Sequence, residues 1–447
     1  MSKDNKKIIE SRRIIKEEKK KIKLEKRLIR KKRRQNFKKT KFGKVLGKVF
    51  FLFSEEKNSY SFSEVFVITI ISLILGVFAC FSMFTIFSGG RNYFKLSKDL
   101  GKFFDVYEVL VDNYYGDIDK EALVDDAING MVSSVGDVYT SYSDIEATDS
   151  FNELVSGVYE GIGCTIQQLE KEIRVIDVYD DSPAEKGGLK VDDLIIKVDD
   201  MDAIEIGVTK LSEYIKNEAK KEIKMVILRG EKEETITLQR GKVETPVITT
   251  KKYEKNNKKI GYLGISIFSS VSYKQFKKEL LELEENGIDS LVIDVRGNNG
   301  GYLSSVSDIA GFLLPKGKVI YQIQRDGKND IIKDKTIEKR EYPIAILVDG
   351  SSASASEILA GVIKESYDGF VVGTKTFGKG TVQQVKKLSD GSMVKYTVEN
   401  WLTPDGNWIN DKGIEPTHLV QLSEEYIKNP IDDNDNQLQK ALELVSK

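Results

Sequence analysis

"YPIAILVDGSSASASEILAG", residues 342–361, joins an apolar run to a helical pattern through a serine-rich turn. The apolar run has the composition of a buried strand, and "SEILAGVIKES" has the apolar spacing of a helix. A strand that passes through a turn into a helix is the building unit of α/β domains. The stretch therefore predicts an α/β domain around it.

The same alternation extends on both sides of this stretch, over residues 243–425. The predicted strands are "KIGYLGISIF", "SLVIDVRG", "YPIAILVDG" and "FVVGTKTFG". The predicted helices are "SYKQFKKELLELEENG", "SVSDIAGFLL" and "SEILAGVIKES". This pattern predicts an α/β core with a mixed sheet.

The flanking regions have a different character. Residues 93–156 show helical spacing until "GDVYTSYSD" interrupts it, and residues 157–242 form short alternating strands and turns. "NDNQLQKALELVSK" predicts a short amphipathic helix within residues 426–447. We therefore expect an N-terminal helical region, a small β-rich domain, the α/β core and a C-terminal helix, in that order.

Charge is distributed unevenly along the 447 residues, although the net charge is −1. Residues 1–48 hold 22 of the 69 Lys and Arg residues but only 5 of the 70 Asp and Glu residues. Residues 65–87 carry no charge, and a helix of that length can cross a hydrocarbon core of about 30 Å. We expect a basic arm over residues 1–64 and a single transmembrane helix over residues 65–87.

The excess of Lys and Arg before the uncharged run predicts a cytoplasmic arm and an extracytoplasmic remainder in the cell membrane. A cleaved signal peptide fits less well, because the arm is long and no A-x-A-like site follows. We expect residues 65–87 and the basic arm to contact membrane lipid, and we expect no nucleic-acid partner.

Cysteine and histidine are scarce. Cys80 and Cys164 cannot plausibly pair, so the chain has no disulfide framework. His418 is the only histidine, which excludes a multi-histidine metal site, and we expect neither a metal nor another cofactor. Catalysis by Ser, His and Asp could run only through His418, but no acidic residue is patterned to orient its imidazole, and the sequence has no G-x-S-x-G elbow for the serine.

The serines of the opening stretch allow two interpretations. The spacing of Ser354 and Glu357 is that of a capping box at a helix start. A serine at a strand–turn–helix junction is also exposed beside amides that can stabilise an oxyanion. A nucleophilic serine needs a base, and with one histidine in the chain that base is not expected to be an imidazole.

Lys379 is the candidate base. It lies between Gly378 and Gly380 in "GTKTFGKGTVQQV", beside apolar residues that could remove water from its amine. Desolvation can lower a lysine pKa from about 10.4 by about 3 units. Gln383, four residues further on the same strand face, could orient the amine. Lys375 shares that face and is the rival base, but it lacks the two glycines.

Residues 157–242 resemble a bacterial PDZ domain. The resemblance rests on "EGIGCTI" (160–166) and "VIDVYDDSPAEKGGLKVDDLIIKVDDMDA" (175–203). It implies that the backbone of a glycine-flanked loop captures the C-terminal carboxylate of a peptide that adds as a strand. The residues implied in this peptide site are Gly161, Ile162, Gly163, Cys164, Leu211 and Ile215.

From about residue 100 onward the chain resembles the C-terminal processing peptidases, also called tail-specific proteases. The motifs are "SASASEILAG", "FGKGTVQ" with its Lys 25 residues after Ser354, "GDVYTSY", "DVRGNNGGYLSSVSDIAGFLL", "TPDGNWINDKGIEP" and "QLQKALEL". The resemblance implies a serine endopeptidase with an inserted PDZ domain. Its departures are small, with Asp349 where Asn is frequent and Asn299 where Pro is frequent.

By position, the resemblance implies Ser354 as nucleophile, Lys379 as general base and Gln383 as the support of the lysine. The turn "RGNNGG" would supply an oxyanion amide from Gly300, with Gly301 as the alternative, to act with the amide of Ala355. An acyl-enzyme would form and be hydrolysed by water.

The expected function is therefore that of a membrane-anchored endopeptidase that recognises C-terminal tails of proteins or peptides. Two alternatives are a tethered PDZ adaptor with an inactive core and a Ser–His hydrolase that uses His418. The adaptor is disfavoured because Ser354, Lys379 and Gln383 are all present. A homo-oligomer is compatible with this organisation.

Overall fold

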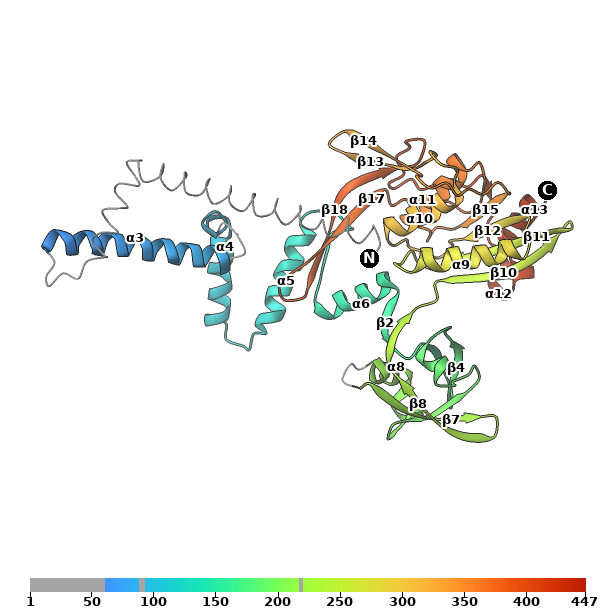
Figure 1. The fold of residues 1–447 in the computed structure, drawn as a ribbon, viewed down its shortest axis with the longest axis horizontal. Helices are drawn as coiled ribbons and strands as arrows, with labels where there is room; N and C mark the ends of the chain where they lie inside the picture. Colours follow the sequence, from blue (N-terminus) through green and yellow to red (C-terminus); the bar gives the residue numbers. More distant parts are fainter. Residues whose placement is uncertain (1–60, 88–92, 217–219) are drawn as a thin grey trace, which may run out of the picture. The chain divides into compact units, whose positions relative to one another are not determined.

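The computed structural model describes residues 61–87, 93–216 and 220–447, and the chain divides into two units, residues 1–118 and 119–447 (Figure 1). The described part of the first unit contains two helices, α3 (Phe62–Phe87) and α4 (Tyr93–Asn113). The predicted basic arm lies almost entirely outside the described residues, so its proposed contact with lipid stays a prediction without a structural description.

The predicted transmembrane helix is wrong. Among the helices of the described ranges, none combines the length and the apolarity that crossing a membrane requires. The prediction for residues 65–87 relied on the absence of charge, which is a weaker condition than sustained apolarity over a full span. The predicted single-pass location in the cell membrane depended on this helix and is therefore also wrong.

The second unit begins with two helices on either side of a short strand. These are α5 (Lys120–Ser133), β1 (Ser141–Ser143) and α6 (Ile145–Ser156). Asp119 and Asp144 begin the helices as N-caps, because their carboxylates accept hydrogen bonds from the first free N–H groups. "GDVYTSYSD" thus contains the β1 strand, and its last residue caps α6.

A β-rich domain follows. Its sheet has the order β3-β4-β5-β7-β8, with β6 beside β5, and it packs on α7 and the kinked α8. The bounds are β3 (Cys164–Leu169), β4 (Glu172–Val178), α7 (Pro183–Lys186), β5 (Leu194–Val198), β6 (Met201–Asp202), α8 (Ala203–Lys216), β7 (Glu222–Arg229) and β8 (Lys232–Gln239).

The chain enters and leaves this domain through a two-stranded ribbon. Strand β2 (Val158–Gly161) runs antiparallel to β9 (Gly241–Glu244), so that Val158 pairs with Glu244 and Gly161 pairs with Gly241. The β-rich domain is therefore an insertion whose two ends are adjacent.

The α/β core is built on a six-stranded sheet of order β10-β11-β12-β15-β16-β19, in which only the β10–β11 pair is antiparallel. The mixed sheet predicted for this region is confirmed. The strands are β10 (Ile248–Lys255), β11 (Lys258–Ile265), β12 (Ser290–Asp294), β15 (Ile344–Val348), β16 (Phe370–Gly373) and β19 (His418–Leu419).

Both faces of this sheet are covered by helices (Figure 1). Alternate residues of a strand point to opposite faces. In β12, Leu291 and Ile293 therefore face a core made with α9 (Ser272–Glu285), α10 (Leu303–Leu313) and α11 (Ala355–Gly361), whereas Val292 faces α13 (Asn436–Val445). Burial on both faces explains why the central strands read as continuous apolar runs.

A second sheet has the order β1-β18-β13-β14, with β17 also paired to β18. Its strands are β13 (Val319–Arg325), β14 (Lys328–Lys333), β17 (Thr381–Lys387) and β18 (Met393–Leu402). Three short helical elements complete the unit, namely η1 (Val362–Ser366), α12 (Glu424–Lys428) and η2 (Asp432–Asn434). Lys379, the predicted base, lies two residues before β17 of this sheet.

The packing of α13 gives a test of stability. Leu442 is buried against the sheet, so Leu442→Ala should lower the free energy of unfolding by about 2–5 kcal/mol. Trp401 is buried in the core that packs on the same sheet, so tryptophan fluorescence during urea unfolding reports on the loss of this structure. Ile427, which is 70% exposed on α12, provides the control. Ile427→Ala should change the same quantity by less than about 0.5 kcal/mol, and equal effects of the two substitutions would contradict the packing described.

Candidate active site

A cleft of about 960 Å³ lies where the two sheets meet. Its walls come from α6, the turn after β12, the start of α11, and strands β17 and β18. The six residues predicted for the catalytic centre and its oxyanion site all line this cleft: Ser354, Lys379, Gln383, Gly300, Gly301 and Ala355. The fold thus brings together residues that are up to 83 positions apart in the sequence.

Ser354 precedes α11 in a strained conformation. Its φ of 54° and ψ of −112° fall where non-glycine residues are rare. Such strain persists only where the surrounding structure imposes it. The residue is half-buried, and it borders the cleft.

The buried carboxylate of Glu357 fixes the backbone of Ser354 and of Lys379 together. Glu357 Oε2 accepts the Ser354 N–H at 2.9 Å and the Lys379 N–H at 2.8 Å. Its Oε1 accepts the Gly378 N–H at 2.7 Å and the Thr376 hydroxyl at 2.6 Å. Each of the two oxygens therefore accepts two hydrogen bonds. Glu357 therefore caps the start of α11, as predicted, and it also binds the turn that carries Lys379.

The turn that carries Lys379 is enclosed by residues 403–416. A side chain at Gly378, whose φ is +93°, would meet the backbone of Gly413 at 2.9 Å and of Lys412 at 3.0 Å. The Trp401 indole N–H donates to the Lys379 carbonyl oxygen at 2.9 Å. The two glycines thus let a second loop close over the lysine turn.

The surroundings of Lys379 favour its neutral form. Burial lowers the pKa of the Lys379 ammonium, and repulsion from Lys395 lowers it further. Asp137 and Glu357 act in the opposite direction, but they do not outweigh burial. A lowered pKa is the property that a lysine base requires.

The rival residues have different surroundings. Lys375 is half-exposed and pairs with Glu415 at 3.2 Å, which leaves its amine in water. His418 lies on the edge strand β19, where its ring packs against Phe370 and its Nδ1 is 3.0 Å from the Thr417 hydroxyl. Neither residue is part of the cleft lining.

Gln383 is anchored through its amide nitrogen. The Nε2 group donates to the Thr381 hydroxyl at 2.9 Å and to the Thr397 hydroxyl at 3.3 Å. These bonds fix the plane of the carboxamide on β17, and its carbonyl oxygen is the end that can accept a hydrogen bond from an amine.

The turn after β12 packs directly on the serine. A side chain at Gly300 would come within 2.9 Å of Ser354 Cβ and 3.1 Å of the Ala355 nitrogen. The Gly300 N–H donates to the buried Asn298 Oδ1 at 2.8 Å. Gly301 and Phe268 form an isolated parallel β-bridge, whose two hydrogen bonds are made by the residues on either side of Gly301. The Phe268 N–H donates to the Gly300 carbonyl oxygen, and the Tyr302 N–H donates to the Phe268 carbonyl oxygen. The Gly301 peptide nitrogen thus faces away from that bridge.

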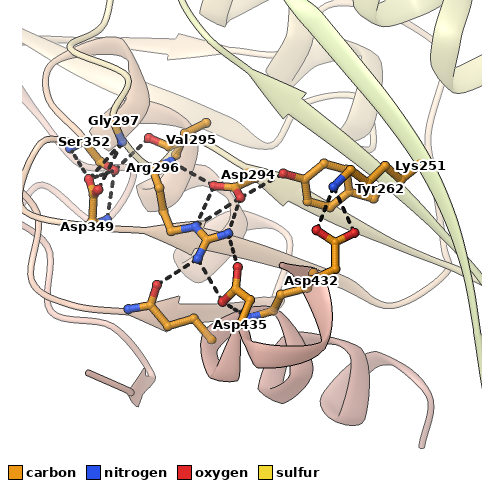
Figure 2. Close-up of polar contacts among 12 residues, drawn as sticks. Lys251, Tyr262, Asp294, Val295, Arg296, Gly297, Asp349, Ser352, Asp432 and Asp435 are labelled. Carbon is orange, nitrogen blue, oxygen red and sulfur yellow. Dashed lines mark hydrogen bonds and ion pairs between the residues drawn. The ribbon is translucent and has the colours of Figure 1, made fainter. Parts of the chain in front are cut away.

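A polar network fixes the base of this turn (Figure 2). The Arg296 guanidinium lies between Asp294 and Asp435, at 2.6 and 2.8 Å. Asp349 accepts the Gly297 N–H at 3.1 Å and also the Ser352 hydroxyl at 3.1 Å. The network connects the turn after β12, the turn before α11 and the start of α13.

Sequence reasoning missed three contributors to this site. They are the second pair of bonds made by Glu357, the Asp435 contact with Arg296, and the approach of the Tyr139 ring to Lys379. Of these three, only Tyr139 could have been suspected from the sequence, because "GDVYTSY" is one of the motifs that carry the family resemblance, although no role was assigned to it. The other contacts join segments that are distant in the sequence.

The predicted PDZ residues lie apart from the cleft, in the β-rich domain. Ile162, Leu211 and Ile215 are buried in its core, and Cys164 packs against that core. Strand β3, which follows Gly163, is an edge strand of the sheet. One side of β3 is therefore without a strand partner in the described sheet.

Comparisons with known proteins agree with this organisation. Peptidase family S41 matches residues 259–420, a PDZ domain matches residues 174–229, and the activating protease CtpB N-terminal domain matches residues 86–147. The peptidase match covers most of the α/β core and includes Ser354 and Lys379.

Full-length relatives extend these matches. The chain is 36% identical to the carboxy-terminal processing protease CtpB of Bacillus subtilis (strain 168), over 75% of this chain and 70% of that protein. It is 35% identical to the carboxy-terminal processing protease CtpA of the same organism, over 78% and 73%. A solved photosystem II D1 C-terminal processing protease aligns at 26% identity with a TM-score of 0.44, over 80% of this chain and 92% of that chain.

The α/β core with its inserted domain is thus a serine-type peptidase. The chain belongs to the carboxy-terminal processing proteases of peptidase family S41, and it carries a PDZ domain.

The enclosure of the lysine turn gives a test of the site. Gly378→Ala should displace this turn, because the new Cβ meets backbone atoms that cannot move aside and the φ is unfavourable. A displacement of about 1 Å predicts a loss of kcat/KM of about a hundredfold. The measurement is cleavage of an unfolded protein. Gly130→Ala, which fills open space on α5, is the control and should keep full activity. Full activity of Gly378→Ala would argue against a fixed lysine turn.

Proposed function

We propose that this peptidase works through a Ser–Lys dyad, with Ser354 as nucleophile and Lys379 as general base. One observation carries the proposal. Glu357 accepts the backbone N–H of both residues on the same oxygen, so the serine and the lysine border one cleft from fixed positions. The burial of Lys379 and its lowered pKa support its role as the base.

The reaction begins when the neutral amine of Lys379 takes the proton of the Ser354 hydroxyl. The alkoxide attacks the peptide carbonyl, and the resulting ammonium gives its proton to the leaving amine. Water then hydrolyses the acyl-enzyme in the reverse sense. Gln383 would accept a hydrogen bond from the lysine through its carbonyl oxygen, since its amide nitrogen is engaged by Thr381 and Thr397.

The oxyanion would be stabilised by the amide of Ala355 together with an amide of the turn after β12. Gly300 packs against Ala355, but its N–H is engaged by Asn298. The exposed Gly301 amide faces away from its bridge to Phe268 and is the better donor in this conformation.

The PDZ domain would select substrates by their C-terminal tails. An extended tail would add to the open edge of β3, beside α8, with its carboxylate at the loop of Gly161, Ile162 and Gly163. Cys164 would then contact the last side chain of the tail, and Leu211 and Ile215, which are buried in the domain core behind this edge, would support the pocket wall and so set its preference. The fit of the PDZ domain to tail recognition supports this part of the proposal.

Substitutions test the dyad. Ser354→Ala and Lys379→Ala should each lower kcat/KM for a fluorogenic peptide with an apolar C-terminal tail by about a thousandfold or more. In the unsubstituted enzyme, kcat/KM should rise with pH as Lys379 loses its proton, at a pH below that of an ordinary lysine because burial lowers its pKa.

Lys375→Ala is the matched control, since it removes a nearby but exposed lysine. It should leave both the rate and the pH dependence unchanged. Binding of the tail peptide, followed by fluorescence anisotropy, should survive in all three variants. Full cleavage by Ser354→Ala would refute the dyad, and loss of cleavage in Lys375→Ala alone would transfer the base to that residue.

A further inference from the structure

The segment "GDVYTSY" (136–142) reaches the catalytic cleft although it precedes the PDZ domain in the sequence. The Nζ atom of Lys379 lies over the Tyr139 ring, 4.7 Å from its centroid. That distance is within the range of a cation–π contact, which extends to about 6 Å. The half-buried ring therefore covers the amine directly.

The position of Tyr139 is fixed by its neighbours. Strand β1 pairs with β18, so that Ser141 lies opposite Lys395. The Thr397 N–H donates to the Thr140 hydroxyl at 3.3 Å. Asp137 accepts the Tyr139 N–H at 3.1 Å and the Thr140 hydroxyl. The pairing with β18 thus holds the residues directly after Tyr139, and Asp137 fixes the turn that carries the tyrosine.

The contact between this segment and β18 also involves Gln383. The Thr397 hydroxyl accepts the amide N–H of Gln383 at 3.3 Å, and the Thr397 N–H engages Thr140. A single residue of β18 thus connects the segment around Tyr139 with the residue proposed to support the lysine. The segment is consequently part of the wall of the lysine site and does not act only as a linker.

The charged groups around the Lys379 amine come from several elements. Lys395 on β18 repels the ammonium, whereas Asp137 in the turn before β1 and Glu357 on α11 attract it. Hydrogen bonds from Thr140, Thr397 and the Tyr139 N–H outweigh the burial of Asp137 and lower its pKa, so this carboxylate stays ionised. Desolvation of Tyr139 raises the pKa of its phenol, which stays neutral.

We propose that Tyr139 is a positioning residue for Lys379. The Tyr139 ring excludes water from the lysine amine and directs the amine toward the cleft. This inference rests on the proposed function of Lys379 as the base. The ring face attracts an ammonium and would raise the lysine pKa, but the ring also removes water and lowers it. Because burial is the largest influence on Lys379, we expect the exclusion of water to dominate.

The test measures the protonation of Lys379 without relying on catalysis. The full chain carrying Ser354→Ala is pulsed with acetic anhydride at a series of pH values, and acetylation of Lys379 is followed by mass spectrometry. Only the neutral amine reacts, so the midpoint reports on the lysine pKa, with the exposed Lys375 as internal reference. Adding Tyr139→Ala should raise the Lys379 midpoint by about one pH unit. Tyr139→Phe, which keeps the ring, should restore the original midpoint.

Tyr142→Ala is the matched control. Tyr142 belongs to the same segment, but its hydroxyl donates to Asp125, so its removal should not move the Lys379 midpoint. In the chain with Ser354 intact, Tyr139→Ala should lower kcat/KM at pH 7 by about tenfold, because the neutral fraction falls tenfold for each unit of pKa. That loss should lie in kcat, with KM unchanged.

The outcomes separate the two proposals. An unchanged or lower midpoint in Tyr139→Ala, or an equal shift in Tyr142→Ala, would overturn the role of Tyr139 while leaving the dyad intact. Undiminished cleavage by Lys379→Ala would instead refute the dyad. If Tyr139→Ala loses its fold by circular dichroism, Tyr139→Leu takes its place. Tyr139→Leu covers less of the amine than the ring does and should give a smaller upward shift, and absence of that shift would overturn the role.

Discussion

The catalytic half of this molecule depends on one buried carboxylate. Glu357 is fully inaccessible to solvent, and its four hydrogen bonds join the turn before α11 to the turn before β17. The first turn follows β15 and the second follows β16, which are neighbouring strands of the six-stranded sheet, and the Phe377 N–H also donates to the Ser352 carbonyl oxygen at 3.1 Å. Because an unpaired buried acceptor or donor costs about 1–3 kcal/mol, the four donors and the carboxylate hold one another in a single arrangement. The Glu357 side chain consequently holds the backbones of Ser354 and Lys379 relative to each other, together with the direct hydrogen bond between the two turns.

Much of the fold follows from the sequence. The central strands are apolar on both faces, as a parallel sheet between helices requires, and the glycines beside Lys379 do allow a loop to close over it. The half-exposed Lys375 pairs with Glu415, whereas Lys379 borders the cleft, and the assignment of the base to Lys379 stays a prediction. The uncharged run at residues 65–87 misled the prediction of a membrane helix, since the lack of charge does not by itself establish a span.

The contacts that adjust the site could not be predicted in this way. Tyr139 meets Lys379 across 240 positions of sequence, and Asp435 meets Arg296 across 139. Local patterns report which face of an element is apolar, but they do not report which distant turn will lie against it. Such contacts depend on the pairing of β1 with β18 and on the packing of α13, which are properties of the tertiary fold.

The ribbon formed by β2 and β9 bears on the evolution of the chain. Gly161 and Gly241 are paired neighbours, so a path that enters the inserted domain returns almost to its starting point. The loop-closure cost of an insertion grows only slowly with its length once the ends are held together. The peptidase core can therefore exchange its inserted module for another of different size without changing its own connectivity. The inserted domain and the peptidase core can thereby change in length independently of each other.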